Sequence, residues 1–244
     1  MPQLTNITTI EATLEVVTGL RIGAGDNEMH IGGVDNTVIK HPLTGAPYIP
    51  GSSIKGKMRS LLEWRSGAVK EKPLAATDYD SQRSNDPQQQ EIKRILQLFG
   101  IGGGDAKDAE ALVRELGPSR LSFWDCPLEE AWEKEVRGNN QLLTEVKSEN
   151  VINRISGVAE HPRNTERVPS GAKFDFKLSV KKLAGDDDEL LKTVLQGLKL
   201  IEHDSLGGSG SRGYGKVKFT NFKIDGQNKQ TDFDQVEAFP KQAS

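Results

Sequence analysis

A glycine-rich run at residues 207–215 has the composition of an anion-binding loop. Five of its nine residues are glycine, and Arg212 and two serines are interleaved with them. Glycine lets backbone N–H groups approach an anion closely, and the guanidinium group favours phosphate. The run is neither a Walker A loop nor a dinucleotide fingerprint, because a helix is expected before it and a strand after it. An ordinary turn between helix and strand is the alternative reading.

A second candidate phosphate site lies at the start of a predicted helix, in the segment PGSSIKGKMR at 50–59. Ser52 or Ser53 is expected to cap the helix, whose free N–H groups and positive dipole end attract anions. The segment also supplies three cations: Lys55, Lys57 and Arg59. A capped surface helix with solvated cations remains the alternative.

Asp35 is the candidate acid–base residue, in the glycine-bearing loop at 29–36. An aspartate in such a loop is commonly a turn-former. Its position relative to the candidate phosphate-binding elements singles it out, because a carboxylate there can bind a divalent cation or take a proton from a ribose 2′-hydroxyl. A histidine base, His30 or His41, stays open as an alternative.

The segment at 149–168 combines groups that suit single-stranded RNA. Planar amides and guanidinium groups clamp phosphates and bases, and apolar side chains wedge between splayed bases. The polar members are Asn150, Asn153, Arg154, Arg163, Asn164 and Arg167, and the apolar members are Ile152, Ile155 and Val158. An ordinary solvated hairpin, with its tip at 157–164, is the alternative.

Hydrophobic periodicity predicts the elements that position these residues. Alternating strands are expected at 7–17, 120–126, 174–180 and 217–224, and helices from 52 or 53, at 92–99, at 128–136 and at 189–203. A small hairpin is expected around the turn at 41–45, and a mobile, irregular insertion at 70–90. This order indicates a split βαβ sandwich with an antiparallel sheet.

Composition narrows the class of protein. The chain has 244 residues, 35% hydrophobic and 27% charged, which suits a single domain with a real core. No apolar run is long enough to span a membrane, the N-terminus does not read as a signal peptide, and the lone Cys126 cannot form an internal disulfide. A cytoplasmic location is expected. The net charge is −3, yet basic side chains outnumber acidic ones in residues 1–70, 145–183 and 199–220, which permits a phosphate-tracking surface.

Four motifs, in this order, resemble one family. They are EVVTGLRIGAG, GGVDNTVIKHPLTGAPYIPGSSIKGKMRSLLE, SENVINRISGVAEHPRNTERVPSGAKFDF and DSLGGSGSRGYGKVKF. The family is that of the RAMP-superfamily backbone subunits of type III-A CRISPR (Csm) effector complexes, and the Val34-Asp35 loop narrows the match to the subunit that cleaves target RNA. The resemblance implies an α+β fold: a modified ferredoxin-like (RRM-like) palm with an antiparallel sheet, a protruding thumb hairpin at about 145–170 and helical insertions, all in one RAMP domain over 1–244.

The resemblance also implies an activity and partners. Such subunits stack as a filament of copies along the CRISPR guide RNA and cleave complementary single-stranded target RNA at regular intervals, in antiviral defence. The other partners are the remaining Csm subunits, including the large polymerase-like subunit. Two alternatives stay open: a non-catalytic guide-RNA scaffold, which needs no acid at Asp35, and an RNase that processes guide precursors with His30 or His41.

Site residues are carried over from the family motifs. Asp35 matches the catalytic aspartate, which would act directly or through a transient Mg²⁺ or Mn²⁺ ion. RNA contacts are expected from Arg21, Ser52, Ser53, Lys55, Lys57, Arg59, Asn153, Arg154, Arg163, Arg167, Gly208, Gly210, Arg212 and Gly213. Arg21 stands where some relatives have histidine, so no histidine role is carried over to that position.

Overall fold

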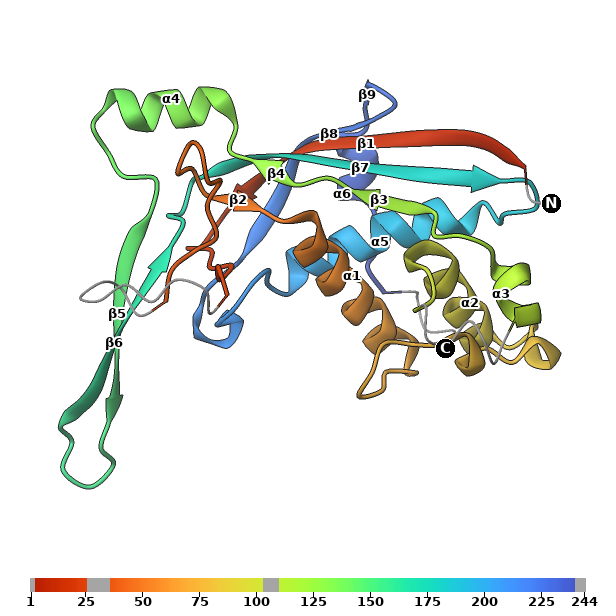
Figure 1. Ribbon diagram of the computed structural model, residues 1–244, viewed down its shortest axis with the longest axis horizontal. Helices are drawn as coiled ribbons and strands as arrows, with labels where there is room; N and C mark the ends of the chain where they lie inside the picture. Colours follow the sequence, from red (N-terminus) through yellow and green to blue (C-terminus); the bar gives the residue numbers. More distant parts are fainter. Residues whose placement is uncertain (1–2, 26–35, 103–109, 240–244) are drawn as a thin grey trace.

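A five-stranded antiparallel sheet, in the order β3-β7-β1-β8-β9, forms the centre of the computed structural model, which describes residues 3–25, 36–102 and 110–239 (Figure 1). Its strands are β1 (Leu4–Val16), β3 (Leu121–Phe123), β7 (Lys173–Leu183), β8 (Val217–Ile224) and β9 (Gln227–Asn228). Alternation places the side chains of β7 in turn in the core and outside it, as predicted, while β1 enters the core only from Ile10 onward and the alternation of β8 breaks between Phe219 and Phe222.

Helices cover one face of this sheet (Figure 1). They are α1 (Gly51–Ser66), α2 (Pro87–Phe99), α3 (Glu110–Leu116) and α5 (Glu189–His203); α4 (Glu130–Gly138) and the short α6 (Gln230–Asp234) lie outside this layer. The order β1-α1-β3-β7-α5-β8, with sheet order β3-β7-β1-β8, is the ferredoxin-like arrangement, and the expected α+β palm is therefore confirmed. Within the described residues, no helix has the length and apolar character to cross a lipid bilayer.

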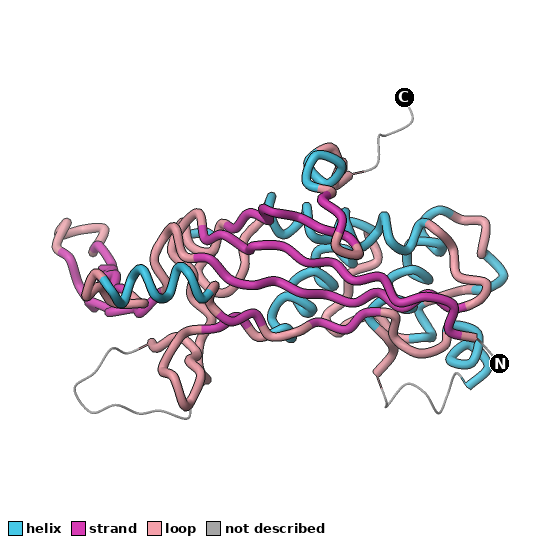
Figure 2. Tube along the Cα trace, turned by 90° about the horizontal axis from the view of Figure 1, so that it is seen from above, coloured by secondary structure: helices cyan, strands magenta, loops and turns pink. Residues whose placement is uncertain are grey.

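A hairpin projects from one end of the sheet (Figures 1 and 2). Its strands β5 (Glu145–Ile152) and β6 (Ala159–Arg167) pair with each other as a two-stranded sheet, and Thr165 of β6 also forms an isolated bridge with Asn36. The turn occupies residues 153–158, and Gly157 there has φ of +71°. The protruding hairpin is confirmed, but the predicted tip at 157–164 is wrong, because most of that segment belongs to β6.

The start of α1 differs from the prediction. Pro50 is the N-cap, and neither Ser52 nor Ser53 caps the helix. The carboxylate of Asp125, from a distant segment, accepts the Gly51 N–H at 2.8 Å instead. An N-cap supplied from a distant part of the chain leaves no signal in the local sequence.

Two other segments also depart from expectation. The turn at 41–45 forms, but only one isolated bridge, Lys40 with Pro47, joins its arms, and β2 (Tyr48–Ile49) pairs with β4 (Cys126–Pro127). The predicted irregular insertion at 70–90 has a defined conformation, with 3-10 turns at Ala76–Asp78 and Ser81–Arg83. Its buried Leu74, Ala76 and Tyr79 are too few to show a period.

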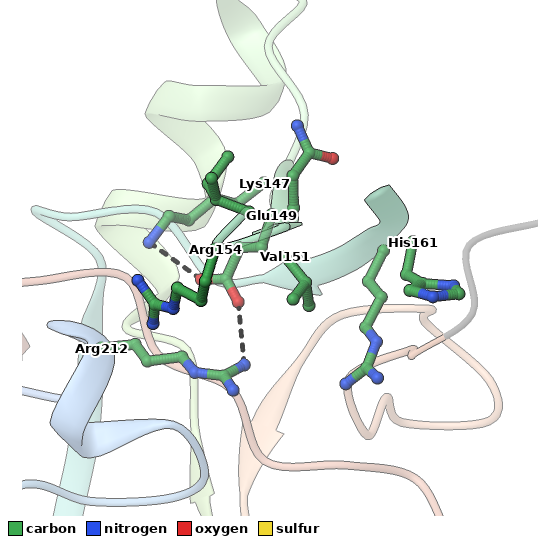
Figure 3. Close-up of a pocket in the computed structure, with 9 residues that line it drawn as sticks. Lys147, Glu149, Val151, Arg154, His161 and Arg212 are labelled. Atoms are coloured by element: carbon green, nitrogen blue, oxygen red, sulfur yellow. Dashed lines mark hydrogen bonds and ion pairs between the residues drawn. The ribbon is translucent and has the colours of Figure 1, made fainter. Parts of the chain in front are cut away.

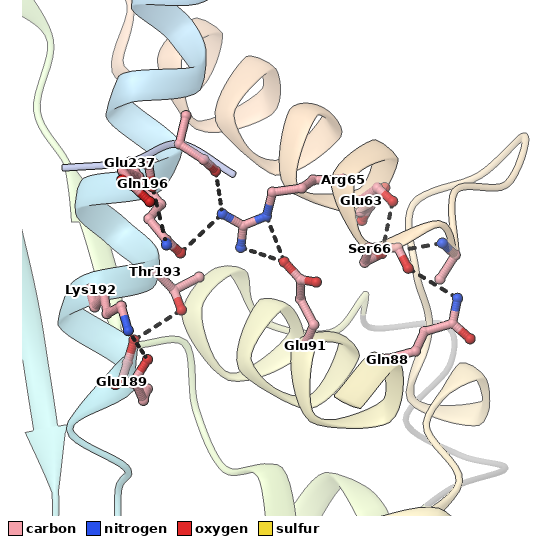
Figure 4. Close-up of polar contacts among 12 residues, drawn as sticks. Glu63, Arg65, Ser66, Gln88, Glu91, Glu189, Lys192, Thr193, Gln196 and Glu237 are labelled. Atoms are coloured by element: carbon pink, nitrogen blue, oxygen red, sulfur yellow. Dashed lines mark hydrogen bonds and ion pairs between the residues drawn. The ribbon is translucent and has the colours of Figure 1, made fainter. Parts of the chain in front are cut away.

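The helical layer is held together by Arg65 of α1 (Figure 4). Its guanidinium donates to Glu91 of α2 at 2.7 Å, and to Gln196 of α5 and the Ala238 carbonyl at 3.0 Å each. A single buried cation therefore connects three helices and the C-terminal segment.

Candidate nucleic-acid interface

The base of the hairpin is anchored through Glu166 of β6. Its carboxylate accepts the Val38 N–H at 3.0 Å and the Thr144 hydroxyl at 2.7 Å, and pairs with Lys40 at 2.6 Å. Burial alone would raise the pKa of Glu166, but these donors outweigh it and hold the pKa below its ordinary value. The hairpin base and the segment that starts at residue 36 are therefore one connected unit.

Asn36 lies between the hairpin and Arg21. Its carbonyl accepts the Glu166 N–H at 2.9 Å, and its side-chain oxygen accepts from Arg21 Nη2 at 2.8 Å. The Arg21 carbonyl in turn accepts the Gly208 N–H at 2.9 Å. Asp35, the predicted catalytic residue and metal ligand, lies outside the described residues, as does His30. The next residue, Asn36, is fixed at the junction of the hairpin and the glycine-rich run.

The glycine-rich run at 207–215 is a tightly packed turn. A Cβ on Gly207 would lie 2.2 Å from the Arg21 carbonyl oxygen, and one on Gly215 would lie 2.0 Å from that of Leu206. The N–H groups of Gly208 and Gly213 already donate to protein carbonyls. The expected phosphate contact through these two N–H groups is therefore not supported, because both are already engaged within the protein; close packing accounts for Gly207 and Gly215 instead.

Tyr214, which the sequence analysis missed, connects this run to the hairpin. Its ring is fully buried, with Lys147 Nζ of β5 at 4.4 Å and Arg167 Cζ of β6 at 4.9 Å from the ring centroid. Cations over an aromatic face are attracted to it. Arg167 also pairs with Glu145 at 2.7 Å and packs against Gly19. Its predicted RNA contact is not supported, because protein groups already hold its guanidinium.

One face of the hairpin and the tip of the run form a groove of about 520 Å³, which we call the cationic groove (Figure 3). It is lined by Lys147, Glu149, Asn150, Val151, Ile152, Arg154, His161, Arg163 and Arg212. The structure thus brings together three predicted RNA contacts, Arg154, Arg163 and Arg212. Lys147, Glu149 and His161 were not predicted, and the alternation of β5 was the one signal that could have placed Lys147 and Glu149 on a shared face.

Asn153 closes the hairpin turn. Its Oδ1 accepts the N–H groups of Ile155 and Ser156, and its Nδ2 donates to Glu160. The predicted contact of Asn153 with RNA is not supported, because its amide is committed to the turn. Beside it Ile155 is 99% exposed, as a wedge residue must be.

The cations of α1 do not line the cationic groove. Lys57 pairs with Asp204 at 2.6 Å, and Lys55 lines a separate hollow with Phe99 and Ser119. Arg59 donates to Glu63 at 2.8 Å and to the carbonyls of Leu74 and Gly100. The predicted RNA contact of Arg59 is not supported, because protein acceptors already bind its guanidinium, whereas the RNA contacts of Lys55 and Lys57 stay predictions.

Metal ligands and histidine bases are sparse around this interface. Among residues 3–25, 36–102 and 110–239, no group of three or more His, Cys, Asp or Glu side chains is placed to hold a metal ion. His41 is exposed, and its Nδ1 accepts the Leu43 N–H within its own turn. The described part of the chain therefore provides no preformed cation site, and His161, not His41, is the histidine that lines the groove.

Comparisons with known proteins find one family over most of the chain. The RAMP superfamily model matches residues 13–218. The CRISPR system Cms endoribonuclease Csm3 of Methanothermobacter thermautotrophicus is 41% identical, over 85% of this chain and 81% of that protein. The proteins of the same name from Mycobacterium tuberculosis and Streptococcus thermophilus are each 40% identical, over 88% and 87% of this chain and 86% of each relative.

Solved structures show the same fold. The Csm3–Csm4 subcomplex of the type III-A CRISPR–Cas interference complex matches with 28% identity and a TM-score of 0.53, over 91% of this chain and 80% of that one. Csm3 of Methanopyrus kandleri matches in fold with 23% identity and a TM-score of 0.56, over 87% and 75% of the two chains. The chain therefore belongs to the RAMP superfamily and, within it, to the Csm3 family.

Proposed function

We propose that this chain is the repeated, CRISPR RNA-binding backbone subunit of a type III-A (Csm) effector complex in antiviral defence. It cleaves the target RNA that pairs with the guide, at regular intervals. The support is its identity of about 40% to relatives named as endoribonucleases, over more than four fifths of its length, together with the cationic groove.

The observation that carries the proposal is the placement of cations in that groove. Arg154 and Arg163 come from the hairpin, and Arg212 comes from the glycine-rich run more than forty residues later. Guanidinium groups bind phosphates in a fork geometry, and contacts to phosphates carry no information on the base sequence. This is the recognition that a subunit needs when it must hold a guide of any sequence.

The proposed chemistry is transesterification within the target strand. Asp35 takes the proton of a ribose 2′-hydroxyl, the 2′-oxygen attacks the adjacent phosphorus, and the bond to the 5′-oxygen breaks. The products are a 2′,3′-cyclic phosphate and a 5′-hydroxyl, which takes up a proton. A regular A-form duplex holds the 2′-oxygen away from in-line attack, so Ile155 at the hairpin tip is proposed to unstack a base and release it.

Dependence on Mg²⁺ or Mn²⁺ is part of the proposal. We propose that a metal ion would be held by Asp35 and RNA phosphate oxygens together. The reaction above is written without a metal-dependent step.

The proposed partners are the guide RNA, the target RNA, further copies of this chain in a filament, and the other Csm subunits, including the large polymerase-like subunit. The similarity to a Csm3 chain solved together with Csm4 supports such assembly.

The test uses the complex assembled on its guide RNA, with end-labelled complementary RNA and Mg²⁺, resolved on a sequencing gel. Evenly spaced cuts are expected from the unaltered chain. Asp35→Ala and Asp35→Asn are expected to abolish the cuts while assembly, checked by size-exclusion chromatography, is retained. Cleavage at an unchanged rate by Asp35→Asn would refute the catalytic role and leave a guide-binding scaffold. Repeating the assay with EDTA, then with Mn²⁺ added back, tests the metal.

A further inference from the structure

A single carboxylate, that of Glu149, lies inside the cationic groove (Figure 3). Its Oε1 is 3.1 Å from Lys147 Nζ, and its Oε2 is 3.2 Å from Arg212 Nη1. Lys147 lies on β5, whereas Arg212 is 63 residues beyond Glu149 in the chain. The carboxylate therefore bridges two cations that the fold brings together from distant segments, with one oxygen on each.

We propose that Glu149 occupies, in the RNA-free chain, the place of an RNA phosphate, and that the phosphate displaces it on binding. This inference rests on the proposed function. A carboxylate and a phosphate accept charge-assisted hydrogen bonds from the same donors at similar distances. The Glu149 side chain is 20% exposed, so it faces an open groove from which an incoming anion can displace it.

The neighbouring groups support displacement rather than a permanent brace. Lys147 also stacks on the buried Tyr214 ring, with Nζ 4.4 Å from its centroid, so its ammonium group stays in place when the carboxylate leaves. Arg154 and Arg163 line the same groove and have no carboxylate partner among the described residues. Three guanidinium groups and Lys147 are thus available to one RNA backbone.

Glu149 then acts as a specificity-determining residue. It keeps Lys147 and Arg212 oriented before RNA arrives, which lowers the ordering cost of binding. It also competes with any anion that enters. A lone small anion gains contacts at this one position only, whereas an RNA strand gains further contacts at Arg154 and Arg163 and displaces the carboxylate.

The test measures binding of a fluorescently labelled single-stranded RNA to the full chain by anisotropy, over a series of KCl concentrations. Glu149→Gln is expected to bind RNA about 3- to 10-fold more tightly at low salt, because two exposed ion pairs no longer compete. The slope of log affinity against log salt is expected to stay the same, because the displaced carboxylate leaves both proteins with the same phosphate contacts. A slope steeper by about 0.7, one further phosphate contact for a single strand, would show that Glu149 is not displaced in the unaltered chain.

Glu160→Gln is the matched control. It removes the same charge from the same hairpin outside the groove lining, and its amide still accepts from Asn153. Its RNA affinity is expected to change less than 2-fold. In an Arg212→Gln background the gain from Glu149→Gln is expected to shrink, because one of the two competing pairs is already absent. Thermal unfolding checks that each variant folds. If Glu149→Gln does not fold, Glu149→Ala replaces it, and the same gain in RNA affinity is expected.

The outcomes separate the two levels of inference. If the unaltered chain binds RNA with a clear salt dependence but Glu149→Gln and Glu149→Ala bind no more tightly, Glu149 is a structural brace and the displacement idea is wrong, while the proposed function stands. If the unaltered chain shows no salt-dependent RNA binding, the proposed function fails and the inference fails with it.

Discussion

Arg59 provides the sharpest test of the interface, because its sequence context predicts RNA binding and its surroundings indicate a structural role. Its guanidinium contacts Glu63 Oε1 at 2.8 Å and the Leu74 and Gly100 carbonyls at 2.7 and 3.3 Å. Glu63 is only 5% exposed, and it also accepts the Leu74 N–H at 3.1 Å. Arg59→Ala therefore leaves a buried carboxylate without its cation and two carbonyls without a donor.

The cost follows from these contacts. Removing one partner of a buried ion pair destabilises a protein by about 3–5 kcal/mol. In a chain of this size, each kcal/mol lowers the melting temperature by about 2–4 °C, so Arg59→Ala is expected to lower it by roughly 6–20 °C.

Thermal unfolding by circular dichroism and RNA anisotropy at a temperature where all variants are folded measure the two roles separately. The control is Lys55→Ala, because Lys55 is a cation of the same helix and has no ion-pair partner among the described residues. This variant is expected to change stability by less than about 0.5 kcal/mol. Arg59→Ala is expected to keep its RNA affinity within 2-fold. A stable Arg59→Ala variant that binds RNA weakly, with a flattened salt dependence, would refute this reasoning and restore Arg59 as a phosphate contact.

Three further predictions follow from the structure. Deleting the hairpin turn at 153–158 is expected to shift cut positions on a sequencing gel more than it weakens RNA binding, and an unaltered cleavage ladder would contradict the wedge role of Ile155. Arg120 and Asp186 form a buried ion pair, with side chains 4% and 3% exposed. Burial by itself would raise the pKa of Asp186, but the Arg120 guanidinium outweighs the effect of burial and holds the pKa below its ordinary value. This stabilisation is complete above the ordinary aspartate pKa and is lost as pH falls through the lowered folded-state pKa. Urea melts of Asp186→Asn should therefore show lower stability at pH 7 and a smaller loss of stability on acidification than the unaltered chain. Parallel profiles of stability against pH would contradict this. Burial raises the pKa of the Cys126 thiol to about 12, so iodoacetamide at pH 8 should modify it only after unfolding; rapid labelling of the folded chain, followed by mass spectrometry, would show that the thiol is accessible.

Much of the fold was predictable from the order of the side chains. The strand at 217–224 and the helix at 189–203 were predicted with the bounds that the structure has, because each has a clear hydrophobic pattern and turn residues at its ends, although a bulge interrupts the alternation of the strand between Phe219 and Phe222. The segment at 70–90 was misread, since its three buried apolar side chains have no regular spacing. The protruding hairpin was predicted from its polar composition, but its turn was not, because Asn153 closes it with contacts that composition does not specify.

The sequence by itself determined the family, the ferredoxin-like order of elements and the set of cations from which an RNA-binding surface is made. Only the tertiary structure decided which of those cations face the groove. Arg59, Arg167 and Arg212 are the same residue type in family motifs, and each pairs with a protein carboxylate. The side chains of the first two are only 16% and 21% exposed, whereas that of Arg212 is 60% exposed and lines the groove. The physical reason is that the role of a charged side chain depends on the donors and acceptors around it. Distant parts of the chain supply those groups, and only folding brings them within reach.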